Sequence, residues 1–120
     1  MKWKSFTCLF YKNNEEVYKD TFKNKLNSDK KIAFDMLEYE TTINLEEKTL
    51  LRENREYIFY LDLKDKNCKV ELKQEGITFD VNVEEGNMEV LNNKIVIEYF
   101  IETDESRNKI IIKERIDFNE

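Results

Sequence analysis

The sequence predicts an all-β protein, built as an antiparallel meander of about eight to ten strands that closes on itself. Apolar side chains alternate with polar ones over most of the 120-residue chain, which places alternate residues on opposite faces of a strand. Turn-forming residues interrupt this alternation about every 8 to 12 residues, as they do in barrels and sandwiches. Proline is absent and glycine occurs only at Gly76 and Gly86, which suits paired strands joined by hairpins.

The first third of the chain gives the weaker signals. Residues 2–11 are aromatic and prone to strand formation, and the segment Lys12-Asn13-Asn14-Glu15 is typical of a turn. Residues 14–27 allow two interpretations. Their i, i+4 apolar spacing fits a helix, whereas the all-β surroundings favour a strand that pairs with residues 2–11, and we prefer the strand. Residues 32–37 and 39–45 then alternate as two further strands.

From residue 49 onward the alternation is regular, and it predicts strands at 49–52, 57–63, 69–73, 77–83, 88–91, 95–101 and 110–116. Glu85-Gly86-Asn87 and Asn92-Asn93 are read as turns, the second because Asn tolerates the positive φ of a tight hairpin. Closure of the sheet would remove the edges that otherwise template aggregation. We therefore expect residues 1–120 to form a single calycin-like β-barrel domain.

Several segments recur in a characteristic order. A threonine-rich strand from Glu40 to Leu45 is followed by Leu50-Leu51-Arg52 and a turn, then by a strand that ends at Tyr60. Gly76 precedes the alternating residues 77–83, and the strands 97–101 and 108–112 complete the pattern.

In this order and spacing, residues 32–116 resemble the YwiB-like family of uncharacterised bacterial proteins. The resemblance implies a calycin-type β-barrel in the bacterial cytoplasm. It implies no activity, because the family has no assigned catalytic residues. Asn54 stands where the family usually has glycine, and Asn can also enter the left-handed region.

Missing residue types exclude several chemistries. Without histidine there is no Ser-His-Asp or Cys-His pair and no histidine-ligated zinc or haem. Cys8 and Cys68 are expected to be buried, reduced thiols, because a disulfide-stapled secreted domain would carry more cysteines. No segment has the 18 or so apolar residues of a membrane span, and the N-terminus lacks signal-peptide features. We expect a cytoplasmic protein with no catalytic residues, no cofactor, no metal and no membrane partner.

The chain carries 20 Lys and Arg residues against 26 Asp and Glu residues, a net charge of −6. Basic residues are interspersed with acidic ones, which argues against nucleic-acid binding, since phosphate contacts need clustered Lys and Arg. Eight Phe, six Tyr and one Trp are enough to fill a small barrel, so we expect a filled interior ahead of a hollow one.

Arg52 is the first candidate for ligand binding, because it ends an apolar strand and a guanidinium can hold a carboxylate through two hydrogen bonds. The alternative is that Arg52 pairs with a nearby glutamate and covers the barrel end with its aliphatic stem. Tyr57, Tyr60 and Tyr99, together with Tyr39, form the second group, because they offer hydroxyl groups to an amphipathic ligand. Their alternative is plain core or rim packing.

Two functions of different class remain open. The leading hypothesis is a small non-enzymatic barrel, monomeric or homodimeric, that binds a small apolar or amphipathic ligand or a protein partner. The second is an acidic structural or inhibitory protein that presents carboxylates to a basic partner, as a nucleic-acid mimic. A contiguous acidic face would favour mimicry, whereas scattered charge around an apolar cavity would favour ligand binding.

Overall fold

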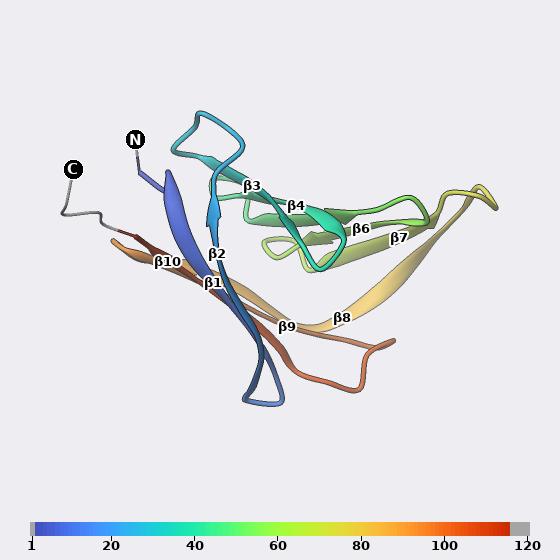
Figure 1. The fold of residues 1–120 in the computed structure, drawn as a ribbon. Helices are drawn as coiled ribbons and strands as arrows, with labels where there is room; N and C mark the ends of the chain where they lie inside the picture. The colour runs from blue at the N-terminus through green and yellow to red at the C-terminus, as the bar shows by residue number, and fades with distance from the viewer. Residues whose placement is uncertain (1, 116–120) are drawn as a thin grey trace.

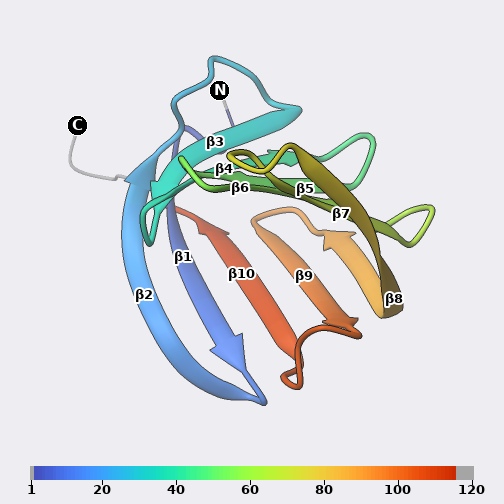
Figure 2. The same cartoon turned by 90° about the vertical axis from the view of Figure 1, so that its right-hand side faces the viewer.

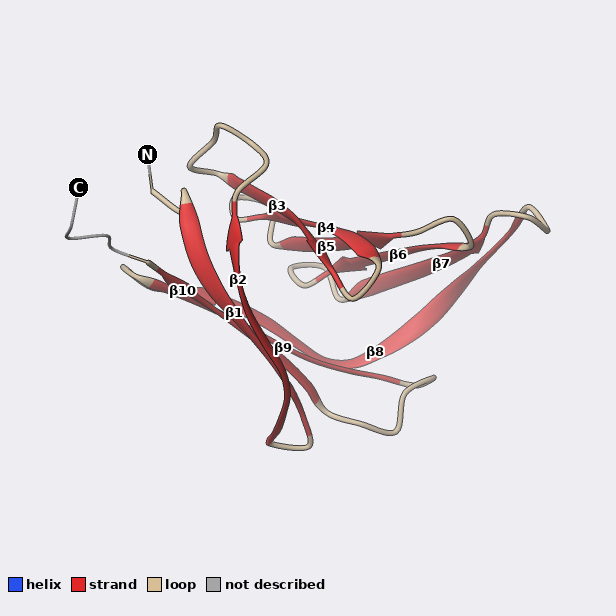
Figure 3. Cartoon of the chain, in the orientation of Figure 1, coloured by secondary structure: helices blue, strands red, loops and turns tan. Residues whose placement is uncertain are grey.

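The computed structural model describes residues 2–115, and within that range the chain is all-β without a helix (Figures 1 and 3). Ten strands form there: β1 (Ser5–Lys12), β2 (Glu15–Lys23), β3 (Lys31–Met36), β4 (Tyr39–Asn44), β5 (Thr49–Glu53), β6 (Tyr57–Asp62), β7 (Asn67–Leu72), β8 (Ile77–Val90), β9 (Lys94–Ile101) and β10 (Asn108–Glu114). The expected continuation of the last strand to Ile116 lies outside the described residues.

All ten strands belong to one antiparallel, nearly closed, barrel-shaped sheet. From β3 to β10 each strand pairs with the next one along the chain, and the β1–β2 hairpin joins through β1 to β10, with Cys8 opposite Ile112. The prediction of an all-β antiparallel meander is confirmed. The strand preferred for residues 14–27 is also confirmed, because β2 spans residues 15–23 there and pairs with β1. The helical alternative for this segment is wrong.

The sheet bends into two walls: β3 to β7 with the first half of β8 form one, and the second half of β8 with β9, β10, β1 and β2 forms the other. Strand β8 therefore belongs to both walls (Figure 2). Its first half pairs with β7 as far as Asn82, and its second half pairs with β9 from Val83 to Val90, with a register shift between Val83 and Glu85. The predicted turn at Glu85-Gly86-Asn87 is therefore wrong, because these residues continue the strand. A β-carbon added at Gly86 would lie 3.1 Å from Leu63 Cδ2, so glycine lets the bent strand pass close to the opposite wall.

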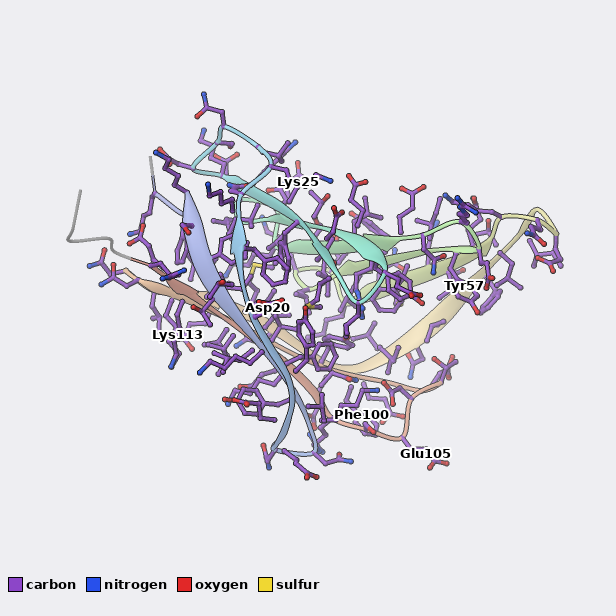
Figure 4. All side chains as sticks on the ribbon, in the orientation of Figure 1. Asp20, Lys25, Tyr57, Phe100, Glu105 and Lys113 are labelled. Carbon is purple, nitrogen blue, oxygen red and sulfur yellow. The ribbon has the colours of Figure 1, made fainter. Side chains whose placement is uncertain are left out.

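The sheet has one seam, between β2 and β3, where no strand ladder forms. Figure 2 shows that β2 approaches β3 only at one end. There the Asn24 side chain substitutes for a ladder: its Oδ1 accepts from Ala33 N at 3.0 Å and its Nδ2 donates to Lys31 O at 3.1 Å. Lys25, labelled in Figure 4, adds a backbone bond to Ala33 O and an ion pair with Asp35. Closure of the barrel is thus completed by the Asn24 side chain, one backbone hydrogen bond and one ion pair.

Aromatic rings pack behind this seam. Phe6, Phe22 and Phe34 come from three strands, and their ring centroids lie 4.9 to 6.0 Å apart. Further along β2, Asp20 lies opposite Cys8 and is exposed, and Figure 4 labels it on the open part of the seam. An inward charge on an edge strand discourages pairing with another chain.

One layer of the interior is filled completely. Successive strands from β3 to β8 bring into register six buried side chains: Ile32, Ile43, Leu50, Leu61, Cys68 and Val81. Cys8, Ile112 and Ile95 form the matching buried row on β1, β10 and β9. Burying each large aliphatic side chain contributes about 1.5 to 3 kcal/mol, so this layer makes a large contribution to stability. Cys8 and Cys68 are free thiols within it.

The hairpin turns follow their sequence signals in part. Asn13 and Asn14 both have positive φ, which matches the tight turn predicted there. Asn92-Asn93 also forms the predicted turn, closed by a bond from Leu91 N to Lys94 O, but positive φ is not found at either residue. Asn54 does not enter the left-handed region either. Its Oδ1 instead accepts from Glu56 N and Tyr57 N, which shapes the turn through the side chain.

We predict that Asn24→Ala lowers the free energy of unfolding by about 1 to 3 kcal/mol, because it leaves backbone groups at the seam without partners. Urea unfolding followed by far-UV circular dichroism measures the change. Asn27→Ala, three residues along the same loop, is the matched control and is expected to lie within about 0.5 kcal/mol of the parent protein. Equal effects of the two substitutions would contradict a closing role for Asn24.

Candidate functional site: a cavity around Arg52

A cavity of about 370 Å³ lies between the two walls, beside the filled layer. Its volume is within the range of about 300 to 1,000 Å³ that is usual for small-molecule sites. The apolar part of the lining comes from strands of both walls and from two hairpin regions: Phe10, Val17, Leu37, Phe59, Val70 and Ile101. The expectation of a filled interior is therefore correct for one layer of the barrel and wrong for its neighbour.

The strand register explains how the cavity is built. Thr41, Arg52, Phe59 and Val70 lie opposite one another on β4, β5, β6 and β7, so they form one inward-facing row. This row stands two residues along each strand from the filled aliphatic layer. Its members differ strongly in shape and polarity, and they pack less completely than the aliphatic row does.

Arg52 reaches from β5 toward the opposite wall. Its guanidinium carbon lies 4.6 Å from the ring centroid of Tyr39 and 5.9 Å from that of Phe10 on β1, both cation–π contacts. Arg52 forms no ion pair with any carboxylate in residues 2–115, and its buried Nε has no hydrogen-bond partner there. The expected pairing with a nearby glutamate is thus not found, and Glu53 pairs with Lys73 instead.

Thr41, opposite Arg52 on β4, is fully buried, and its hydroxyl group also lacks a partner within the described chain. Two unsatisfied polar atoms on paired residues are unusual, because leaving a buried polar group unbonded costs about 1 to 3 kcal/mol. Of these two residues only Arg52 lines the cavity, and the Thr41 hydroxyl group is buried beside it on β4.

Tyr99 lies on β9, opposite Gly86, and contributes its ring to the same cavity. Its ring centroid is 6.2 Å from that of Phe59. Burial raises the pKa of the Tyr99 hydroxyl to about 12, although the nearby Arg52 guanidinium works in the opposite direction. Tyr99 is therefore a neutral hydroxyl group at physiological pH, able to donate or accept a hydrogen bond.

Asp104, Asn108 and Lys12 form the polar side of the lining. The Asp104 carboxylate accepts hydrogen bonds from Asn108 Nδ2 at 2.9 Å and from Ser106 N at 2.9 Å. Burial alone would raise the pKa of Asp104, but these two bonds and the Lys12 charge lower it. Asp104 is thus a satisfied anion.

Three of the four site residues proposed from the sequence line the cavity: Arg52, Tyr57 and Tyr99. Tyr39, considered with them, lines it too, and Figure 4 labels Tyr57 on β6. Tyr60 is not part of the lining. It is on the opposite face of β6 from Phe59, and partial burial with the nearby Asp62, Glu47 and Asp65 raises its pKa.

Sequence reasoning missed Phe10, Phe59 and Leu37 as lining residues. Phe59 had a usable signal, because Tyr57 and Phe59 are two residues apart and share a face, whereas Tyr57 and Tyr60 cannot. Leu37 had none. It is exposed and takes positive φ together with Glu38 in a two-residue turn, a conformation that costs a non-glycine residue about 1 kcal/mol or more.

Charge on the outer surface is mixed. Neighbouring strands place Lys69 opposite Asp80, and Lys109 opposite Glu98. Within residues 2–115, no group of three or more Cys, Asp and Glu side chains is placed to hold a metal ion, and no helix is long and apolar enough to cross a membrane. No family model, curated protein or solved structure matches the chain. The cavity geometry is therefore the basis for a functional argument.

We predict that Arg52→Met leaves the free energy of unfolding unchanged or raises it by up to about 1 kcal/mol, because an unpaired, partly buried charge is replaced by an apolar side chain of similar length. Leu61→Ala, in the filled layer, should lower it by about 2 to 5 kcal/mol. Chemical unfolding of both variants provides the comparison. A loss above about 1 kcal/mol for Arg52→Met would indicate that Arg52 holds the barrel end together.

We also predict that stability falls in alkaline solution, because the buried thiols and Tyr99 have pKa values above their ordinary ones. For Tyr99 the stabilisation is fully present below pH 10 and is lost as the pH rises toward about 12. Cys8, with its pKa raised by burial from 9.0 to about 12, adds to the loss from pH 9 upward. Guanidinium unfolding at pH 8 and pH 11 should show a smaller loss for Tyr99→Phe than for the parent, and an equal loss would contradict the assignment.

Proposed function

We propose that the protein is a non-enzymatic binding protein that takes one small apolar or amphipathic molecule into the cavity around Arg52. The observation that carries the proposal is the cavity itself, which has an apolar and aromatic lining and one arginine, Arg52, that forms no ion pair within residues 2–115. Such a combination is the usual composition of a small-molecule site.

The surroundings of the cavity support the same function. Exposed apolar residues of the lining, Val17, Leu37 and Tyr57, come from three separate parts of the chain. Leu37 is held there at positive φ in a turn where Asn or Gly would be easier.

A binding role fits the available side chains better than catalysis. Histidine is absent from the sequence, so a nucleophile lacks the usual base near neutral pH. Burial raises the pKa of Cys8 to about 12 and that of Cys68 to about 11, which keeps both thiols protonated and unreactive.

The alternative of an acidic nucleic-acid mimic receives less support. It requires a continuous face of carboxylates, whereas acids on the outer surface pair with bases, as in Lys30 with Glu46 and Arg107 with Glu85. Docking of a protein partner likewise has no residue-level support comparable to the cavity. We further propose a bacterial, cytoplasmic protein of the YwiB-like, calycin-type group, for which the all-β meander and the order of the sequence segments are the supporting observations.

We predict that the neutral, polarity-sensitive dye 1-N-phenylnaphthylamine binds saturably to the protein, with increased fluorescence and a raised melting temperature, because only the native state holds the cavity. Val70→Phe fills the cavity from β7 and is expected to weaken dye binding by about tenfold or more, which corresponds to about 1.4 kcal/mol.

Val90→Phe is the matched control, since Val90 is exposed on β8 and is not part of the lining. It should bind the dye like the parent protein. Absence of saturable binding to the parent, or equal binding by Val70→Phe, would overturn the proposed function.

A further inference from the structure

The charges inside the cavity do not cancel. Three charged side chains line it, Lys12, Arg52 and Asp104. Asp104 is satisfied by Asn108 and Ser106, and the nearby Lys12 offsets its negative charge. Arg52 therefore contributes one positive charge without an opposite charge in the described residues.

The guanidinium of Arg52 is held in a way that suits a bound anion. Its central carbon lies over the rings of Tyr39 and Phe10, 4.6 and 5.9 Å from the ring centroids. The guanidinium has five N–H donors; the Tyr99 hydroxyl group interacts with Arg52, and no carboxylate of residues 2–115 forms an ion pair with it. Nε is buried and has no partner within residues 2–115, so the terminal N–H groups are the donors proposed to meet a ligand. A planar carboxylate can accept two hydrogen bonds from such a group.

The cavity continues into an apolar strip on β6, β7 and β8. Tyr57, Leu72 and Ile77 lie opposite one another on these strands, and Phe79 belongs to the adjoining row with Val70. Tyr57, Ile77 and Phe79 are all exposed. Because Tyr57 and Val70 also line the cavity, the strip offers an apolar path from Arg52 to the surface.

From these observations we infer that the natural ligand class is a monocarboxylate with an apolar body. The carboxylate binds Arg52, the body fills the space beside Phe59 and Val70, and its far end contacts the strip at Tyr57 and Ile77. A single negative charge matches the single uncompensated positive charge. This inference rests on the proposed function and specifies the chemistry of that same site.

Matched pairs of an acid and its neutral alcohol provide the test: octanoate with 1-octanol, and 3-phenylpropanoate with 3-phenyl-1-propanol. Each compound competes with bound 1-N-phenylnaphthylamine at pH 7.5. In the parent protein each acid should bind at least about tenfold more tightly than its alcohol, because a charge-assisted hydrogen bond contributes about that much. Octyl phosphate, which carries more charge, should bind no more tightly than octanoate.

Variants at Arg52 assign the effect to one residue. Arg52→Gln should abolish the preference for the acids while leaving the alcohols unchanged, and Arg52→Lys should restore part of it, since Lys keeps the charge but lacks the planar fork. Arg55→Gln is the control, because Arg55 is an exposed arginine on the neighbouring turn and does not line the cavity. Far-UV circular dichroism and dye binding verify that each variant is folded.

The outcomes separate the two proposals. Equal affinity for acids and alcohols, or an unchanged preference in Arg52→Gln, would overturn the carboxylate assignment while the dye result still supports a ligand-binding barrel. Tighter binding of octyl phosphate than of octanoate would overturn the assignment of a single charge. Failure of the dye to bind the parent would overturn the proposed function itself.

Discussion

Strand β8 is the constraint on which the remainder of the barrel depends. It is the one strand of residues 2–115 that pairs with both walls, with β7 through its first half and with β9 through its second. The shift of register between Val83 and Glu85 bends it, and Gly86 allows the bend to approach Leu63. Because the Tyr99 ring lies opposite a residue without a side chain, the same corner that turns the sheet also makes room in the interior.

Two adjacent rows of inward residues divide the interior into a packed part and an open part. The row from Ile32 to Val81 is buried and, apart from Cys68, aliphatic, and its burial contributes to stability. The next row includes Thr41 and Arg52, whose unsatisfied polar atoms reduce stability. Apolar replacements at these positions would be expected to fold at least as well, which is why the proposed binding role starts from this row.

Much of the fold could be predicted because its signals are local. Alternation identified nine of the ten strands of residues 2–115 with close boundaries, and asparagine pairs located two hairpins. The error at residues 85–87 arose because Gly beside Asn resembles a turn, whereas here glycine serves a long-range contact with Leu63. For the site, Arg52, Tyr57 and Tyr99 were identified from residue type and do line the cavity. Tyr60 was placed wrongly in the same group: it is three residues from Tyr57 on the same strand, so its side chain lies on the outer face.

The sequence by itself determined which side chains face inward, because the period of two is a property of each strand and requires no knowledge of its neighbours. Only the tertiary structure decided that Arg52 has no carboxylate partner within residues 2–115 and that its guanidinium lies near the Phe10 ring, since this depends on how two walls distant in sequence meet. It also decided that β2 and β3 stay unpaired and are tied together by Asn24. Those long-range contacts set which row is packed and which encloses a cavity.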